Sequence, residues 1–439
     1  MNTIFFKYCF LLFAFSAFAQ NGNKISVINN ENGIKLVVNE KDFMINGMNW
    51  DYFPIGKNYE FSLWNQSEEF IKTALDDEMS LLKNMGVNTI RVYTGIQPKW
   101  ITYIYENYGI YTMLNHSFGR YGVALNGVWT PITDYRNPET QKVLVSEVTE
   151  MAKTYKNTPG LLLFLLGNEN NYGLFWAGAE TEDFPDDENL KIKLGEERGR
   201  PMYKLFNEAA IQMKAIDQNH PIAICNGDLL FLDIIADECK DVDILGTNMY
   251  RGVSFGDAFE KVKNELNKPI LFTEFGADAF NALKDTEDQE MQAFYAIENW
   301  KEIYVNAAGL GKANNSIGGF TFQFSDGWWK LGQTKDLMVH NTGASWGNGG
   351  YELDFKKGIN NMNEEWFGIC AKGPTNSDGF YKLYPRAAYY ALKKIHEFNP
   401  YKNGISEKSL EKHFCKVKIK KALKEAKKDQ INLDKSNTN

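Results

Sequence analysis

The chain has 439 residues, of which 44% are hydrophobic and 24% charged, with a formal net charge of −8. This acidic balance argues against a nucleic-acid partner, and the length allows one barrel domain of about 250 residues with insertions. Four of the five cysteines lie beyond the N-terminal segment, at Cys225, Cys239, Cys370 and Cys415. Their scattered spacing predicts no zinc site and assigns no disulfide, and no motif indicates a cofactor.

The N-terminal stretch has the pattern of a secretory signal. Lys7 stands in a short basic region, residues 8–18 form an apolar run, and Ala17, Phe18 and Ala19 fit the small-x-small cleavage rule. The run is shorter than the ~20 apolar residues of a membrane span, although an uncleaved anchor is the alternative. We therefore expect residues 1–19 to be removed and the protein to be periplasmic or extracellular, with no transmembrane segment after cleavage.

Strand-like apolar runs alternate with helical patterns through most of the remaining chain. We predict strands at residues 43–49, 89–93, 110–116, 161–166, 221–226, 242–250, 269–276 and 318–324. Helices are predicted at residues 68–85, 97–107, 137–155, 202–216, 255–266, 286–305 and 385–398, with Ser67 as a cap of the first. Eight strands alternating with helices are typical of the α/β class and of a (β/α)8 TIM barrel.

Four further segments complete the predicted organisation. A short hairpin at residues 24–42 precedes the barrel, which is expected to occupy residues 20–400 as one domain. The acid-rich insertion at residues 172–199 is interpreted as a solvated loop, with calcium binding as the alternative. The Gly-, Asn- and Trp-rich residues 326–363 are interpreted as a wall or lid of the substrate site, or else a surface decoration, and the lysine-rich residues 401–439 as a frayed helix or tail.

Two of the predicted strands end in a glutamate. Six large apolar residues at 161–166 precede Gly167, Asn168 and Glu169, and a similar run at 269–276 contains Glu274. A strand this apolar is buried on both faces, so a carboxylate beside it costs several kcal/mol unless it is paired, neutralised or used. Two such carboxylates, one as acid/base and one as nucleophile, are what a retaining glycosidase requires.

The motifs LLGNEN and ILFTEFG resemble the acid/base and nucleophile strands of the clan A glycoside hydrolases. Those proteins are (β/α)8 barrels with catalytic glutamates on strands four and seven, the places that Glu169 and Glu274 take in the predicted order. The chain is most similar to the barrel domain of glycoside hydrolase family 2, with some resemblance to β-1,3-glucanosyltransferases in TIRVYTGIQP and DILGTNMY. Family 2 enzymes usually carry β-sandwich domains before the barrel, whereas here only a short stretch separates the expected cleavage site from strand one.

The resemblance implies a role for several matched residues. Glu169 would be the acid/base and Glu274 the nucleophile, and Asn168 would bind the sugar 2-hydroxyl. Arg91 matches the arginine beside the nucleophile, although an ion pair within the barrel mouth is the plainer interpretation. Tyr250 matches the tyrosine that donates to the nucleophile, with a core tyrosine as the alternative.

Other candidates for the same pocket rest on their place at strand ends. His116 resembles a histidine often found after strand three, but it could equally be a capped loop histidine. Trp328 is favoured over Trp329 as the platform under the sugar. Trp50 is a weaker candidate for this pocket, and so are Asn49 and Asn248.

The sequence as a whole predicts an exported retaining β-glycosidase that acts on a β-linked oligosaccharide or polysaccharide, such as a glucan, mannan or galactoside. One alternative is a β-glucan transglycosylase, in which a sugar hydroxyl intercepts the same covalent intermediate. A second alternative is a non-catalytic carbohydrate-binding barrel, although such a protein would typically lack one of the two glutamates. A carbohydrate is the only partner that we predict.

Overall fold

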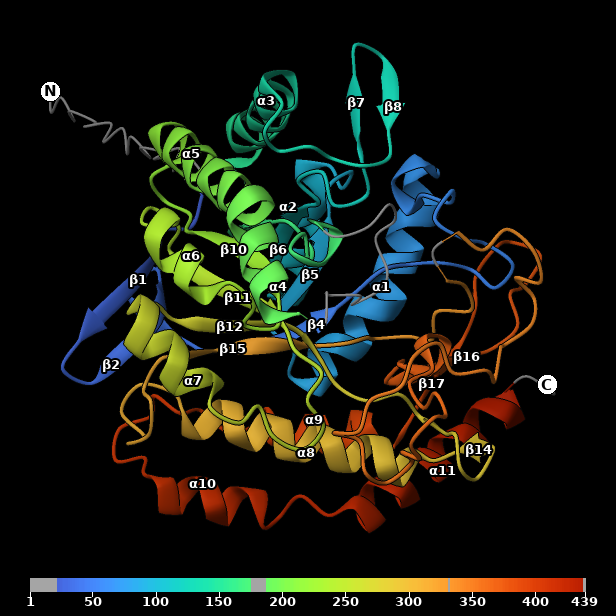
Figure 1. Ribbon diagram of the computed structural model, residues 1–439. Helices are drawn as coiled ribbons and strands as arrows, with labels where there is room; N and C mark the ends of the chain where they lie inside the picture. The colour runs from blue at the N-terminus through green and yellow to red at the C-terminus, as the bar shows by residue number, and fades with distance from the viewer. Residues whose placement is uncertain (1–21, 175–186, 331, 437–439) are drawn as a thin grey trace, which may run out of the picture.

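A computed structural model of the chain describes residues 22–174, 187–330 and 332–436, so the predicted signal peptide lies outside the described residues. Eight parallel strands form a closed barrel in the order β10-β11-β12-β15-β4-β5-β6-β9 (Figure 1). They are β4 (Ile45–Asn49), β5 (Thr89–Tyr93), β6 (Tyr111–His116), β9 (Leu161–Leu166), β10 (Ile222–Gly227), β11 (Ile244–Asn248), β12 (Ile270–Phe275) and β15 (Ser316–Thr321). The predicted (β/α)8 barrel is confirmed.

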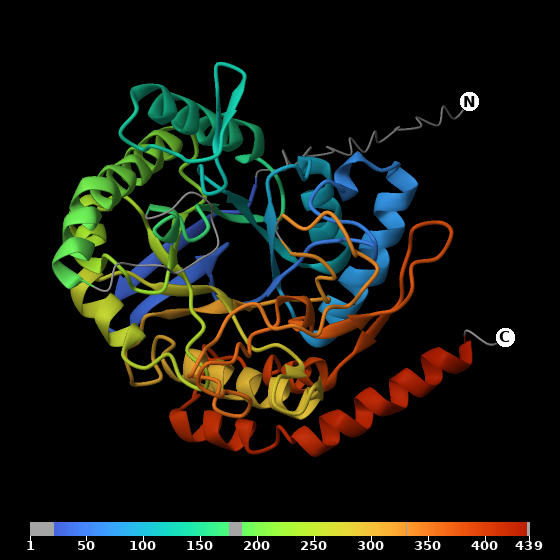
Figure 2. The same ribbon diagram turned by 45° about the vertical axis from the view of Figure 1, so that its right-hand side comes forward.

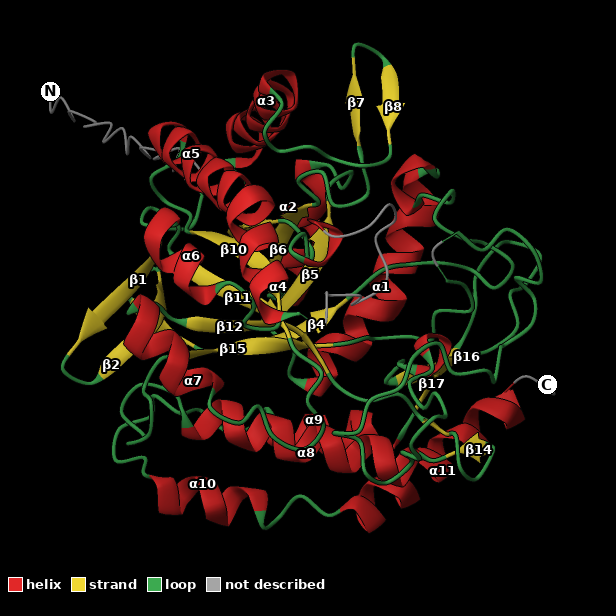
Figure 3. Ribbon diagram, in the orientation of Figure 1, coloured by secondary structure: helices red, strands yellow, loops and turns green. Residues whose placement is uncertain are grey.

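Helices surround the barrel (Figure 3). They are α1 (Glu68–Met85), α2 (Pro98–Tyr108), α3 (Pro138–Tyr155), α4 (Glu188–Leu194), α5 (Arg200–Ile216), α6 (Leu232–Glu238), α7 (Ala258–Lys261), α8 (Gln289–Val305), α9 (Ala387–Ile395), α10 (Glu407–Phe414) and α11 (Ile419–Ser436). The 3-10 and π turns are η1 (Leu63–Asn65), η2 (Tyr172–Leu174), η3 (Gly195–Gly199), η4 (Val262–Leu266) and η5 (Glu364–Trp366). No helix in the described ranges combines the length and the apolar character needed to cross a bilayer.

The apolar run of β9 has the two-sided burial that its sequence predicts. Leu163 and Leu165 join the cluster that fills the barrel, whereas Phe164 and Leu166 join the cluster between the strands and the helices. All six residues of the strand are buried. The strand is therefore covered on both faces, and only its carboxyl end is available for chemistry.

The predicted helix at residues 68–85 coincides with α1, and the Ser67 hydroxyl accepts a hydrogen bond from the Phe70 N–H at 3.2 Å. Strand one is shorter than predicted. It begins at Ile45, because residues 41–43 pair with the N-terminal hairpin as the separate strand β3 (Lys41–Phe43).

The N-terminal segment forms a three-stranded antiparallel sheet of β1 (Ile25–Asn30), β2 (Gly33–Val38) and β3. Leu36 and Val38 of this sheet belong to the same buried cluster as Leu163 and Phe320 inside the barrel. In Figure 1 the sheet lies at one end of the barrel, and the long loops with β16 (Cys370–Lys372) and β17 (Leu383–Pro385) lie at the other. The sheet therefore closes the amino end and leaves the carboxyl end to the loops.

Four segments between the predicted elements carry structure that the sequence did not predict. A hairpin of β7 (Val123–Leu125) and β8 (Val128–Thr130) lies between β6 and α3, and α6 follows β10. Residues 172–199, expected to be a loop, include α4, which the Asp187 side chain caps by accepting from the Leu190 N–H at 2.9 Å. Most of the acidic run considered for calcium lies outside the described residues. The short pair β13 (Phe280–Asn281) and β14 (Thr286–Glu287) precedes α8.

The C-terminal region is not the tail that its lysine content suggested. Residues 407–436 form α10 and α11, which pack on α8 and α9 beyond the predicted domain end at 400 (Figure 2). Leu410 is 1% exposed, and Phe414 lies 6.3 Å from the ring of Tyr304 on α8. The apolar side of these helices therefore extends the core.

We expect Leu410→Ala to lower the free energy of unfolding by about 3 kcal/mol, because the substitution leaves a cavity at a buried position. The neighbouring exposed change Lys412→Ala should alter it by no more than about 0.5 kcal/mol. Urea unfolding followed by circular dichroism measures both values. Equal, small effects of the two changes would show that α10 contributes nothing to the core.

Candidate active site

The turn after β9 directs Glu169 to the carboxyl end of the barrel. Gly167 has φ +87°, and a Cβ at this position would come within 2.7 Å of Asn170 Oδ1. Glu169 itself has φ +59°, a conformation that costs about 1–3 kcal/mol for a residue other than glycine. Its N–H donates to the Cys225 carbonyl of β10 at 3.1 Å. The chain thus holds an unfavourable backbone conformation in order to place this carboxylate.

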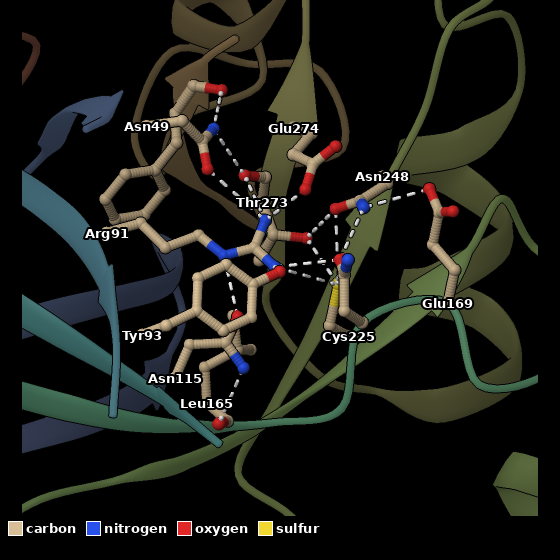
Figure 4. A network of polar contacts seen from close by, with 12 residues as sticks. Asn49, Arg91, Tyr93, Asn115, Leu165, Glu169, Cys225, Asn248, Thr273 and Glu274 are labelled. Carbon is tan, nitrogen blue, oxygen red and sulfur yellow. Dashed lines mark hydrogen bonds and ion pairs between the residues drawn. The ribbon is translucent and has the colours of Figure 1, made fainter. Parts of the chain in front are cut away.

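Glu274 on β12 is held by a cation and a hydroxyl. Arg91 Nη1 lies 2.6 Å from Glu274 Oε1 (Figure 4). The Tyr250 hydroxyl donates to Glu274 Oε2 at 3.1 Å. The side chains of Arg91 and Glu274 are 1% and 13% exposed. An ion pair this well buried is little screened by solvent.

Two asparagines connect the glutamates. Asn168 Oδ1 accepts from Arg91 Nη2 at 2.9 Å and from Asn248 Nδ2 at 3.0 Å. The same Asn248 amide donates to Glu169 Oε1 at 2.9 Å. A register shift between β11 and β12 pairs Asn248 with Glu274 across the strands. The two carboxylates therefore belong to one hydrogen-bonded network at one end of the barrel (Figure 4).

Three residues that sequence reasoning did not identify as part of the site hold this network in place. Asn115 Oδ1 accepts from Arg91 Nε at 2.8 Å, and the Thr273 carbonyl accepts from Arg91 Nη1 at 3.2 Å. Cys225 Sγ lies 3.2 Å from Asn248 Oδ1, and burial raises the pKa of this thiol to about 11, so it remains protonated. All three side chains point into the barrel, and this inward orientation was the only signal that could have found them.

Asn49 was predicted as a weaker candidate for the sugar pocket, but its side chain contacts residues inside the barrel. Its side-chain amide donates to the Thr273 carbonyl at 3.0 Å, and its Oδ1 accepts from Arg91 at 3.3 Å. Asn49 is therefore a residue that positions Arg91.

Removing the arginine is expected to destabilise the protein strongly. Arg91→Met leaves Glu274 buried without its counter-ion and should lower the free energy of unfolding by about 3–5 kcal/mol. The exposed pair of Arg136 and Asp134, with side chains 59% and 51% exposed, provides the control. Arg136→Met should cost less than about 1 kcal/mol in the same urea titration. If both variants behave alike, the interior ion pair has no structural role.

Residues 326–363 border the nucleophile side of the site. Trp346 packs edge-on against Tyr250 with ring centroids 5.9 Å apart, and Asn348 Nδ2 donates to the Tyr250 carbonyl at 2.7 Å. Burial raises the pKa of Tyr250 well above its usual value, and the charges of Glu274 and Glu169 raise it further. The tyrosine hydroxyl therefore remains a proton donor to Glu274, and part of the long segment supports it.

Trp328, expected as the platform under the sugar, lies in a stack of rings. Its ring stacks on His340 at 4.5 Å, and His340 stacks in turn on Trp366 at 3.9 Å. The ring of Phe322, which directly follows β15, has its centroid 6.4 Å from that of Tyr250. The predicted strand ran on to residue 324 and so treated Phe322 as part of the barrel wall. Trp329 packs on Phe53, with centroids 5.1 Å apart.

Trp50 is also absent from the carboxylate network. Its indole N–H donates to Glu78 Oε2 on α1 at 2.6 Å, and the residue is 5% exposed. Side chains alternate along a strand and its extension, so Asn49 points into the barrel and Trp50 toward the helices. Trp50 therefore packs in the core.

The same alternation turns His116 toward α3, because Asn115 takes the inward position on β6. Its Nδ1 accepts from the Phe118 N–H at 3.1 Å, and its Nε2 lies 3.5 Å from Glu147 on α3. The interpretation as a capped loop histidine fits this position better than a sugar contact.

His116 should make the fold sensitive to acid. Burial lowers its pKa from 6.5 to about 4, so below pH 6.5 the unfolded chain binds a proton that the folded protein does not. The free energy of unfolding should therefore fall by about 2 kcal/mol from this group between pH 7 and pH 5. His116→Gln should lose that component. Urea unfolding of both proteins at both pH values measures it, and identical pH dependence would contradict it.

Within the described part of the chain, no group of histidine, cysteine, aspartate and glutamate side chains is arranged to hold a metal ion. The four described cysteines are free, three of them buried and Cys415 exposed.

The closed parallel barrel, with two glutamates at the carboxyl ends of its fourth and seventh strands, has the architecture of a glycoside hydrolase. The family model described as glycosyl hydrolases family 2, TIM barrel domain, matches residues 29–307. The chain belongs to this family. The match begins within β1 and ends before β15, the eighth strand of the barrel. No curated protein has a sequence that matches the chain significantly.

Solved structures share the fold at low sequence identity. A β-galacturonidase from Eisenbergiella tayi, bound to galacturonate, has 16% identity and a TM-score of 0.52, covering 86% of this chain and 55% of that one. A β-glucuronidase from an uncultured Clostridium sp. has 16% identity and a TM-score of 0.52, covering 85% and 53%. A Bacteroides uniformis β-glucuronidase has 14% identity and a TM-score of 0.52, covering 85% and 37%. The chain spans about half the length of these proteins or less.

Proposed function

We propose that the protein is an exported β-glycosidase that hydrolyses β-linked saccharides with retention of configuration. Glu274 attacks the anomeric carbon, while Glu169 protonates the departing oxygen and then activates water. The observation that supports this assignment is the placement of both carboxylates in one hydrogen-bonded network at the carboxyl end of the barrel. Glu274 has a buried arginine at 2.6 Å, and Glu169 accepts from the amide of Asn248.

These positions suit the two roles. A retaining mechanism needs one carboxylate at the anomeric carbon and one at the departing oxygen, and the network holds Glu274 and Glu169 at the same end of the barrel. Asn168, which Arg91 and Asn248 both hold, is placed to bind the sugar 2-hydroxyl.

A substrate screen tests the proposal. The purified protein is assayed on 4-nitrophenyl β-glucoside, β-galactoside, β-mannoside, β-glucuronide and β-galacturonide, and on β-linked oligosaccharides. The uronides are included because the similar structures are named for them. We expect cleavage of at least one β-linked substrate, with proton NMR showing a β-configured first product. An α-configured first product contradicts retention, and no cleavage at all favours a non-catalytic barrel.

The same screen at high substrate concentration separates hydrolysis from transglycosylation. Products longer than the substrate would show that a sugar hydroxyl competes with water for the covalent intermediate. Export is tested independently by sequencing the N-terminus of the secreted protein, which should begin at Gln20.

A further inference from the structure

The hairpin β7–β8 packs on α3 through β7 and leaves other residues in solvent. It projects beside α3 in both views of the fold (Figures 1 and 2). Val123 is 3% exposed, and Leu125 shares a pocket with Val143 and Ser146 of α3. Both residues belong to β7, and they point toward the same side. That side of β7 therefore packs against α3.

Trp129 lies on the other face. It pairs with Ala124, whose side chain alternates with those of Val123 and Leu125, so the indole is turned away from α3. The ring lies against Gly122, where a Cβ would come within 2.6 Å of indole Cζ2. Even so, Trp129 is 60% exposed. One side of this large ring is held against the backbone while much of its surface remains open.

The base of the hairpin is bonded to the catalytic network. Asn168 Nδ2 donates to the Tyr121 hydroxyl at 2.9 Å, and Arg120 Nε donates to the Asn168 carbonyl at 2.8 Å. Tyr121 directly precedes Gly122 and is itself 38% exposed. Two partly exposed aromatic residues therefore lead outward from the residue next to Glu169 to Trp129.

The strand order indicates on which side of the substrate Tyr121 and Trp129 lie. The hairpin extends from β6, which pairs with β9, the strand before Glu169. The nucleophile strand β12 is four strands away from β6 in the closed barrel, and Trp346 stands on that side. In the proposed mechanism Glu169 protonates the leaving group, so the path beside Glu169 faces the leaving group.

We infer that Trp129, with Tyr121, forms a platform for the sugar units on the leaving-group side of the cleaved bond. The inference rests on the proposed function. The occupant is a β-linked oligosaccharide, because such sugars present flat C–H faces that pack on exposed aromatic rings, while Tyr121 offers a hydroxyl at the inner end.

The test compares substrates that differ only beyond the cleaved bond. Wild-type, Trp129→Ala and Val128→Ala proteins are assayed on the shortest β-linked oligosaccharide that is cleaved and on the matching 4-nitrophenyl monoglycoside. Val128 is the matched control, because it is 67% exposed in the same hairpin but lies on the opposite face. The ratio of kcat/KM for the oligosaccharide to kcat/KM for the monoglycoside should fall about five- to tenfold in Trp129→Ala only.

Two further measurements keep the outcomes distinct. Trp129→Phe, which retains a ring, should recover part of the lost ratio, whereas a merely misfolded hairpin would not be rescued in this way. An unchanged ratio in Trp129→Ala overturns the inference and leaves the proposed function standing. A change in molar mass by light scattering together with an unchanged ratio also overturns it, since the ring would then contact a second copy. Absence of turnover of either substrate by wild-type protein overturns the proposed function itself.

Discussion

Glu274→Ala is expected to lower kcat by about 10⁴-fold or more, because no other group can form the covalent intermediate at that position. The smaller side chain also leaves room for a small anion between Arg91, Tyr250 and the sugar. Azide should therefore restore turnover and give a glycosyl azide of inverted configuration, which NMR of the product identifies.

Glu274→Gln provides the control for this experiment. It keeps the volume of the side chain and an oxygen to accept from Arg91, so it should be as inactive as the alanine variant but should not respond to azide. Circular dichroism checks that both variants are folded. A kcat within about tenfold of wild type, or a rescued product of retained configuration, contradicts the assignment of the nucleophile.

Glu169→Ala is expected to reduce kcat/KM on oligosaccharides by about 10³-fold, since a general acid contributes 10²- to 10⁴-fold. The loss should depend on the leaving group. Dinitrophenolate departs without protonation, so formation of the intermediate from a 2,4-dinitrophenyl glycoside should be slowed far less.

The chain contains a matched control for this second experiment. Glu208 also follows an asparagine, Asn207, but it lies exposed on α5 and accepts from Gln212 at 2.8 Å. Glu208→Ala should leave all rates unchanged. Equal sensitivity of good and poor leaving groups to Glu169→Ala would exclude Glu169 as the acid.

The central features of the site could be predicted because they follow from local sequence. Six apolar residues predict a strand buried on both faces, and a parallel barrel delivers the residues that follow such a strand, here Glu169, to its carboxyl end. Arg91 and Tyr250 were found through the resemblance, because each matches a clan A residue at a strand end. The structure places both within hydrogen-bonding distance of Glu274.

What sequence reasoning missed depends on side-chain direction and on packing over long distances. Residue type alone does not tell which of two neighbours at a strand end points inward, so His116 was chosen where Asn115 is the inward residue, and Trp50 was ranked equally with its inward neighbour Asn49. The C-terminal helices did carry a signal, since Leu410 and Phe414 lie four residues apart on one helical face. Their many lysines concealed it.

The pairing of Arg91 with Glu274 also bears on biosynthesis. The two residues are 183 positions apart. At a synthesis rate of about 5–20 residues per second, the arginine leaves the ribosome about 10–40 s before its partner exists. Until then a nascent barrel that buried residue 91 would hold an uncompensated cation, so we expect burial of the arginine before its partner is present to be unfavourable. We therefore expect the barrel interior to exclude water only after the seventh strand has been added.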